Sequence, residues 1–152
     1  MTILTEEFIR GSHAGNMMDL LRQVPFLYLS QTGGRGGLTT VTIRGGDPNF
    51  TLVMVDGIPV NDPTNILGGS FDFSTLSVEN IKQIEIVRGP MSALYGSESV
   101  GGVINIITRG GENEPNLFVN GILGNFNSRQ IGFRTGGPLK SGNYSLAGSH
   151  FN

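Results

Sequence analysis

Phosphate binding is the first chemistry that the glycine pattern suggests. Gly96 and Gly101 have the G-x-x-x-x-G spacing of a loop that cradles phosphates. Such a loop continues with Lys and then Ser or Thr, whereas Gly102 and Val103 stand at those positions here. Because the lysine that would reach the phosphates is missing, the pattern argues against a nucleotide-binding enzyme. We interpret Gly101 and Gly102 as a packing or turn device before the strand that follows.

Histidine, cysteine and aspartate give no catalytic or metal-binding pattern. His13 and His150 lie near opposite ends of the chain, without ligands at metal-binding spacing. A Ser-His-Asp arrangement is not expected, since His13 falls between two predicted helices and His150 in a late strand. There is no cysteine, and Asp47 and Asp62 lack the dense acidic spacing of a calcium loop. The sequence therefore predicts no enzyme, no metal site and no cofactor.

The composition indicates a glycine-rich β protein that does not bind nucleic acid. The chain has 152 residues, enough for one domain with an appendage and a real core. Its net charge is −2 and its 10 Lys and Arg are spread along the chain, so no basic face for phosphates forms. The 24 glycines have no collagen-like period and indicate turns, bulges and close backbone approaches. No apolar run approaches the roughly 20 residues of a membrane-spanning helix, and no signal peptide is recognisable.

Two short helices are expected near the N-terminus. Thr5 can cap the first, which Gly11 ends, and acidic residues in its first turn suit the helix dipole. Asn16 can cap the second, with Asp19 three residues later and Pro25 stopping it. The apolar stripe of this second helix is expected to face the core.

Period-two alternation and β-branched runs predict the strands of the main body. They cover residues 26–30, 38–43, 51–55, 83–88 and 103–108. Residues 51–55 could pair with 40–44 as a hairpin, and Asp56-Gly57 is a tight-turn signal. Ser77 can cap a short helix over residues 78–82. The nearly continuous apolar run 103–108 predicts a central strand that is buried on both faces.

The pattern changes after Thr108. Residues 109–115 look like a linker, and residues 117–123, 130–135 and 144 onward alternate between turn signals. Ile131, Phe133 and Thr135 would share one face of a strand. The other face would hold Gln130, Gly132 and Arg134. This is the apolar-out, polar-in pattern of barrel staves, and only three segments fit, whereas a barrel needs at least about eight.

Three stretches resemble a known family. They are Thr42-Ile43-Arg44-Gly45, Val53-Met54-Val55-Asp56-Gly57-Ile58-Pro59, and the segment from Ile84 to Arg109, which includes Arg88-Gly89-Pro90 and Ser92-Ala93-Leu94-Tyr95-Gly96. Together they resemble the plug domain of TonB-dependent outer-membrane receptors. The resemblance implies an α+β fold: a small mixed β-sheet plug domain with short helices, followed by the first antiparallel strands of a transmembrane β-barrel. We expect the plug at residues 1–109, with a linker and the N-terminal fragment of the barrel at 110–152.

The resemblance also implies a function in the cell outer membrane. The plug would gate the active uptake of a scarce nutrient, such as a siderophore-iron complex or cobalamin. Its partners would be its own β-barrel and, in the full-length receptor, TonB. We expect the chain to be a fragment that lacks the Ton box and most of the barrel. The alternative is a soluble periplasmic ligand-binding module that uses the plug fold.

The resemblance assigns roles to two arginines and two loops. Arg44 and Arg88 would lock the plug to acidic residues of the barrel wall; internal pairing with Glu85 or Asp56, or simple exposure, is the alternative. Tyr95 is expected in the core or as an anchor to the barrel. Loops 46–50 and 61–69 would touch the substrate, although they could equally be ordinary solvated loops. Their candidate substrate-binding residues combine hydrogen-bonding groups with apolar surface: Asp47, Asn49, Phe50, Asn61, Asp62, Asn65, Ile66 and Leu67.

Overall fold

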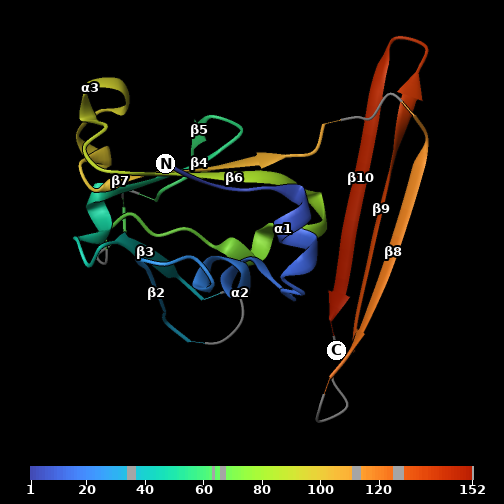
Figure 1. Ribbon diagram of the computed structural model, residues 1–152, viewed down its shortest axis with the longest axis horizontal. Helices are drawn as coiled ribbons and strands as arrows, with labels where there is room; N and C mark the ends of the chain where they lie inside the picture. Colours follow the sequence, from blue (N-terminus) through green and yellow to red (C-terminus); the bar gives the residue numbers. More distant parts are fainter. Residues whose placement is uncertain (34–36, 63, 66–67, 111–113, 125–128, 152) are drawn as a thin grey trace.

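The body of the protein is built on a small mixed sheet, with a separate antiparallel sheet at one end (Figure 1). The computed structural model describes residues 1–33, 37–62, 64–65, 68–110, 114–124 and 129–151. The strands are β1 (Thr2–Leu4), β2 (Leu27–Gln31), β3 (Thr39–Ile43), β4 (Thr51–Val55), β5 (Ile58–Pro59), β6 (Ile81–Arg88), β7 (Gly102–Thr108), β8 (Asn116–Leu123), β9 (Arg129–Leu139) and β10 (Gly142–Phe151). The helices are α1 (Glu6–Gly11), α2 (Met17–Arg22), α3 (Ser92–Tyr95) and the 3₁₀ turns η1 (Pro48–Phe50), η2 (Phe73–Thr75), η3 (Val78–Asn80) and η4 (Ser97–Ser99).

The five-stranded sheet has the order β1-β6-β7-β4-β5, with β4 and β7 parallel and the other pairs antiparallel. The central position expected for residues 103–108 is therefore confirmed. Ile104 and Ile106 are fully buried in the main core, whereas Val103 packs on the opposite face with Leu52 and Met54. The burial expected on both faces is only partly confirmed, because Asn105 and Ile107 on the face of Val103 are half-buried.

The main core lies between the five-stranded sheet and the layer that holds α1, α2, β2 and β3 (Figure 1). The caps expected for both helices are confirmed. The hydroxyl of Thr5 accepts from the backbone N–H of Phe8 at 3.3 Å, and Oδ1 of Asn16 accepts from that of Asp19 at 2.9 Å. Leu20 on α2 is fully buried, as its apolar stripe predicts.

The hairpin expected between residues 40–44 and 51–55 is wrong. β3 pairs with β2 in a two-stranded sheet, while β4 lies between β5 and β7. Arg44 and Gly45 have φ values of 57° and 73°, and η1 follows them, so the connection leads the chain into another layer. The first four residues of β4 are buried, and a central position next to β7 covers both of their faces.

The turn prediction at Asp56-Gly57 is confirmed. Both residues have positive φ, 51° and 80°, and Val55 pairs with Ile58 across them, as in a two-residue hairpin. The Asp56 carboxylate accepts from the backbone N–H of Thr108 at 2.8 Å and from its hydroxyl at 2.6 Å. The turn is thereby tied to the end of β7.

The helix expected at residues 78–82 is shorter than predicted. It is the 3₁₀ turn η3, and Ile81 already belongs to β6. The Ser77 hydroxyl donates to the carboxylate of Glu79 and does not cap the turn. Without that cap, the burial of Ile81 against the core favours an early start of the strand.

Strands β8, β9 and β10 form an antiparallel sheet at the opposite end of the body from α3 (Figure 1). The alternation expected on β9 is confirmed: Ile131 and Phe133 are 59% and 41% exposed, whereas Gly132 and Arg134 are buried. Leu117, Ile131 and Phe133 lie on the face of this sheet that is turned away from the body, whereas Phe118 lies beside Arg10 of α1. None of the helices that the structure describes is long and apolar enough to cross a membrane.

Candidate functional site

The two loops proposed for substrate contact lie against each other. A Cβ on Gly68 would stand 2.2 Å from Oδ1 of Asn49, and one on Gly69 would stand 2.7 Å from the backbone oxygen of Pro48. Only glycine fits at such distances. The structure therefore brings the loops at 46–50 and 61–69 together into one surface. This surface lies beside η4, because the backbone oxygen of Phe50 accepts a hydrogen bond from the backbone N–H of Gly101 at 2.7 Å.

Asn61 supports this surface from behind. Its Oδ1 accepts from the backbone N–H of Val53 at 2.6 Å, and its Nδ2 donates to the backbone oxygens of Thr51 and Gly69, both at 3.0 Å. Asn61 is half-buried, and its amide group uses both its donor and its acceptor within the protein. It therefore fixes the loop to β4, a role that the sequence did not predict.

The acidic residues of the loops also shape the backbone. Asp47 accepts from the backbone N–H and from the side-chain amide of Asn49, both at 2.9 Å. Asp62 accepts from the hydroxyl and the backbone N–H of Thr64, and these bonds lower the pKa of the exposed Asp62 carboxyl. Both carboxylates remain on the exposed surface.

The other candidates differ in exposure. The aromatic ring of Phe50 is 46% exposed, while the half-buried Asn65 donates to the hydroxyl of Ser70 at 2.9 Å. Ile66 and Leu67 lie outside the described residues. The described part of the site thus offers one exposed aromatic side chain and several hydrogen-bonding groups.

The two arginines proposed as a lock have different surroundings. Arg44 is exposed at the end of β3. Arg88 is half-buried; it donates to the hydroxyl of Thr2, and its guanidinium lies 5.6 Å from the ring centre of Phe26. Arg88 thus contacts the N-terminal strand β1 through Thr2.

The internal partners considered for these arginines bind other groups. Glu85 accepts from the side-chain amides of Gln83 at 2.8 Å and Asn105 at 3.3 Å. The Asp56 carboxylate binds Thr108, as described above. The alternative of pairing with Glu85 or Asp56 is therefore not what the structure shows for Arg88.

The glycine pair at the start of β7 is a packing device, as expected. Gly102 has φ of 147°, and a Cβ there would stand 2.3 Å from the backbone oxygen of Val87 and 2.7 Å from the Ile43 side chain. Tyr95, by contrast, is 45% exposed, so its expected core position is wrong. The short helix α3 places its ring at the surface, where only the interpretation as an anchor remains open.

A second polar cluster, which the sequence did not predict, ties α1 to the segment after β7. The Arg109 guanidinium lies 2.8 Å from the Glu6 carboxylate, and the Arg109 side chain is only 10% exposed. Arg10 also reaches Glu6 at 2.5 Å, and its guanidinium lies 5.9 Å from the ring centre of Phe118 on β8. The hydrogen bond from Arg109 is the main cause that lowers the pKa of Glu6, with the charges of nearby arginines adding to it.

Apart from the ring of Phe118 beside Arg10, the contact between the body and the β8–β10 sheet is made by hydrogen bonds. The side-chain amide of Asn120 donates to Glu79 at 3.0 Å, and that of Gln130 donates to the backbone oxygen of Gly15 at 2.8 Å. A Cβ on Gly132 would stand 2.8 Å from the Glu79 carboxylate, so a larger residue where β9 passes η3 would displace that side chain. These partners are far apart in the sequence, and local patterns give no signal for them.

The family of the chain follows from a match with the TonB-dependent Receptor Plug Domain over residues 1–103. The chain belongs to this family. Within the described residues, no three His, Cys, Asp or Glu side chains gather as a metal site would require.

Known relatives are transporters and receptors. The chain is 34% identical over 145 residues to the vitamin B12 transporter BtuB of Vibrio vulnificus (strain CMCP6), covering 91% of this chain and 23% of that protein. It resembles the structure of the siderophore receptor PirA from Acinetobacter baumannii, with TM-score 0.76, 31% identity and coverage of 99% of this chain and 24% of that one. The ferric enterobactin receptor PfeA from Pseudomonas aeruginosa gives a TM-score of 0.72 and 28% identity, over 97% of this chain and 24% of that one. The chain thus spans about a quarter of the length of these relatives.

Proposed function

We propose that the chain is the gate of an outer-membrane receptor that actively takes up a scarce nutrient, such as a siderophore-iron complex or cobalamin. Residues 1–109 are the plug, and residues 110–152 are a linker and the first strands of the surrounding barrel wall. TonB and the rest of the barrel are its protein partners. The proposal requires no catalysis by this chain.

The observation that carries the proposal is the orientation of the β8–β10 sheet. Its inner face is mainly polar and contacts the body through Asn120 and Gln130, with Phe118 beside Arg10, whereas Leu117 and Leu123 on the other face are 74% and 84% exposed. A sheet that is polar towards a folded body and apolar on its outside suits a wall between a lumen and lipid. The family match over the body supports the same arrangement.

Gating by force on the N-terminus is compatible with the position of β1. It is an edge strand that pairs with β6 over only three residues, from Thr2 with Ile86 to Leu4 with Ile84. An edge strand can be removed without breaking the pairing of the strands behind it. A pull by TonB would therefore first act on β1 and its contact between Thr2 and Arg88, and then on the contact between Arg109 and Glu6 at the start of α1.

The lock between plug and wall is assigned to the two arginines. Arg44 is exposed and can reach an acidic residue of the wall directly. Arg88 would pair with an acidic residue of the wall once its hydrogen bond with Thr2 is broken. The partner of Arg88 would therefore depend on the position of β1. The substrate contacts are assigned to Asp47, Asn49, Phe50, Asn61, Asp62, Asn65, Ile66 and Leu67, with Asn61 acting through the shape of the loop.

A chimera tests the function. The part of the Vibrio vulnificus BtuB that aligns with this chain is replaced by this chain, and the rest of the relative is kept. In cells without another cobalamin transporter, we expect the chimera to support energy-dependent uptake of labelled cyanocobalamin and to keep the membrane closed to large antibiotics.

Two control experiments are needed to interpret the result with the chimera. The same barrel without any plug should admit the antibiotics and lose energy-dependent uptake. If the chimera leaks like this control although the protein is present in the outer membrane, the gating function is wrong. If the isolated chain is instead secreted as a compact periplasmic monomer that binds a nutrient, the binding-module alternative is correct.

A further inference from the structure

A cavity of about 580 Å³ lies where α2 and the segment of η2 and η3 face the ends of β9 and β10. Sites for small molecules commonly have volumes of roughly 300–1,000 Å³. Among the residues assigned above to substrate contact that the structure describes, none lines this cavity, which is on the side of the body next to the β8–β10 sheet. It is therefore a separate feature of the molecule.

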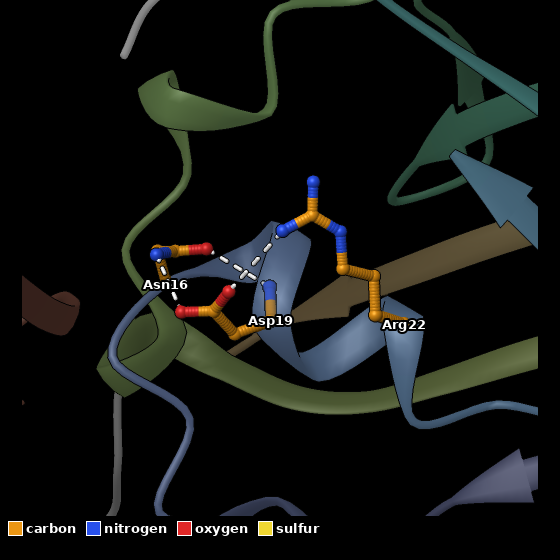
Figure 2. A network of polar contacts seen from close by, with 3 residues as sticks. All are labelled: Asn16, Asp19 and Arg22. Carbon is orange, nitrogen blue, oxygen red and sulfur yellow. Dashed lines mark hydrogen bonds and ion pairs between the residues drawn. The ribbon is translucent and has the colours of Figure 1, made fainter. Parts of the chain in front are cut away.

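The polar groups at the α2 side of the cavity are held by one another (Figure 2). Asn16 donates from Nδ2 to Asp19 at 2.7 Å, and a guanidinium nitrogen of Arg22 lies 3.7 Å from the other carboxylate oxygen of Asp19. On the opposite side, the bond from Gln130 to the backbone oxygen of Gly15 joins β9 to the loop before α2. The fully buried Met17 lies beneath. The walls are thus ordered before any ligand arrives.

The lining carries no excess of charge. Among the described lining residues, Asp19 supplies the one carboxylate and Arg22 the one guanidinium, and the two form an ion pair. The remaining polar side chains of the lining are amides and hydroxyls, which come from Asn16, Gln31, Gln130, Ser74, Ser77 and Ser149, while His150 pairs with Ile131 and shares its outward face. Apolar side chains, among them Leu76 and Val78, complete the lining. Such a surface suits an amphiphilic molecule with many hydrogen-bonding groups, and it offers little to a multiply charged anion.

We propose that this cavity is a second subsite for the nutrient, and that it binds an uncharged part rich in amide or hydroxyl groups between α2 and strands β9 and β10. This inference rests on the proposed function, because it takes the ligand to be the transported molecule. It predicts that the transported nutrient is a neutral compound and that a trianionic ferric tricatecholate binds this cavity weakly.

Equilibrium binding to the full chain in detergent tests the proposal with three probes: cyanocobalamin, a neutral ferric trihydroxamate and a trianionic ferric tricatecholate. We expect at least one neutral probe to bind at least about tenfold more tightly than the trianion, a difference of about 1.4 kcal/mol. The proposal is overturned if neither neutral probe binds, or if the trianion binds more tightly than both.

Three variants, one of them a control, test whether the probes bind in the cavity. Ser74→Trp puts a large ring into the lining and should lower the binding affinity for the neutral probe at least about tenfold. Ser97 is an exposed serine outside the cavity, and Ser97→Trp should change this affinity less than about twofold. Asp19→Asn removes the partner of Arg22 and should increase the affinity for the trianion. Equal effects of both tryptophan variants, with folding verified by circular dichroism, would exclude the cavity as the site.

The chimera separates the two proposals. If the chimera carries uptake and Ser74→Trp in it leaves both uptake and binding unchanged, the subsite is wrong and the gate function stands. If the wild-type chimera leaks and takes up nothing, the gate function itself is wrong.

Discussion

The body and the β8–β10 sheet use the same kind of residues in opposite ways. In the body, Leu20, Ile84 and Ile104 are completely buried. In the β8–β10 sheet, Leu123 and Ile131 are 84% and 59% exposed, and the buried positions of β9 include Arg134 and Gly132. One part of the chain is apolar inside, and the other is apolar outside.

This difference shows that the two regions depend on different surroundings. The body removes its core side chains, such as Leu20, Ile84 and Ile104, from water by itself, which stabilises it at about 25 cal/mol for each Å² of apolar surface. The β8–β10 sheet gains this contribution only when lipid, detergent or another surface covers its outer face. Its polar inner face, in contrast, is matched to the body through Glu79 and Gly15.

The largest expected effect comes from separating the regions. Residues 1–110 should be a soluble monomer, because they retain the main core, whereas residues 1–152 should aggregate or need detergent. Gel filtration with light scattering measures this directly. A compact, soluble monomer of the whole chain without detergent would mean that the outer face of β8–β10 is covered within the chain, contrary to the comparison.

A strong destabilisation of the body is expected from Gly102→Ala. The new Cβ meets a backbone oxygen at 2.3 Å, and φ of 147° is strained for alanine. We expect a loss of about 3 kcal/mol or more in the free energy of unfolding, measured by urea denaturation. Gly11→Ala, where nothing lies within 4 Å, is the matched control and should change stability little. Similar midpoints for the two variants would contradict the close packing of β7 against β6.

Polar contacts inside the body should matter almost as much. Asn61→Ala removes three hydrogen bonds and leaves the backbone N–H of Val53 without its side-chain acceptor. The expected cost is about 1–3 kcal/mol. Hydrogen exchange at Val53 should accelerate, while Asn49→Ala, an exposed residue in the adjoining loop, should leave it unchanged. Unchanged exchange in Asn61→Ala would show that the loop does not depend on this side chain.

The junction between the two regions can be broken separately. Gly132→Ala would place a Cβ 2.2 Å from Oδ1 of Asn120 and 2.8 Å from Glu79, whereas Gly121→Ala, on the neighbouring strand, meets nothing within 4 Å. We expect Gly132→Ala to cost about 1–2 kcal/mol and to increase hydrogen exchange at residues 77–80 in detergent. If both variants behave alike, the sheet does not dock on η3 as described.

The smallest effect concerns the ion pair between Glu6 and Arg109. The folded state lowers the pKa of Glu6 from 4.5, so the pair stabilises the fold above that pH, and this contribution is lost as the pH falls through the lower folded pKa. Because Glu6 is partly exposed, solvent screening keeps the effect small. At pH 7, Glu6→Gln should have a lower urea midpoint of unfolding than wild type. At a pH below the folded pKa of Glu6, the two midpoints should be the same. Glu7→Gln, at the exposed neighbouring residue, should match the urea midpoint of wild type at both pH values. If the midpoint of Glu6→Gln differs from wild type by the same amount at both pH values, this ion pair is not the cause.

Local chemistry made much of the fold predictable. The caps at Thr5 and Asn16, the turn at Asp56-Gly57 and the face shared by Ile131 and Phe133 depend on residues within a few positions of each other. The central position of β7 followed from its continuous apolar run. In the candidate site, the sequence indicated which loops to consider, but it did not show that Gly68 lies against Asn49 or that Asn61 holds the loop.

The sequence by itself determined the local turns, the helix caps and the opposite polarity of the two regions, because these depend on backbone preferences and on the period of apolar residues. Only the tertiary structure decided that β4 pairs with β7 rather than β3, that Arg88 contacts Thr2, and that Glu6 contacts Arg109. The reason is physical: each of these contacts joins segments far apart in the chain. Their partners are selected by the packing of the whole core, which no local pattern records.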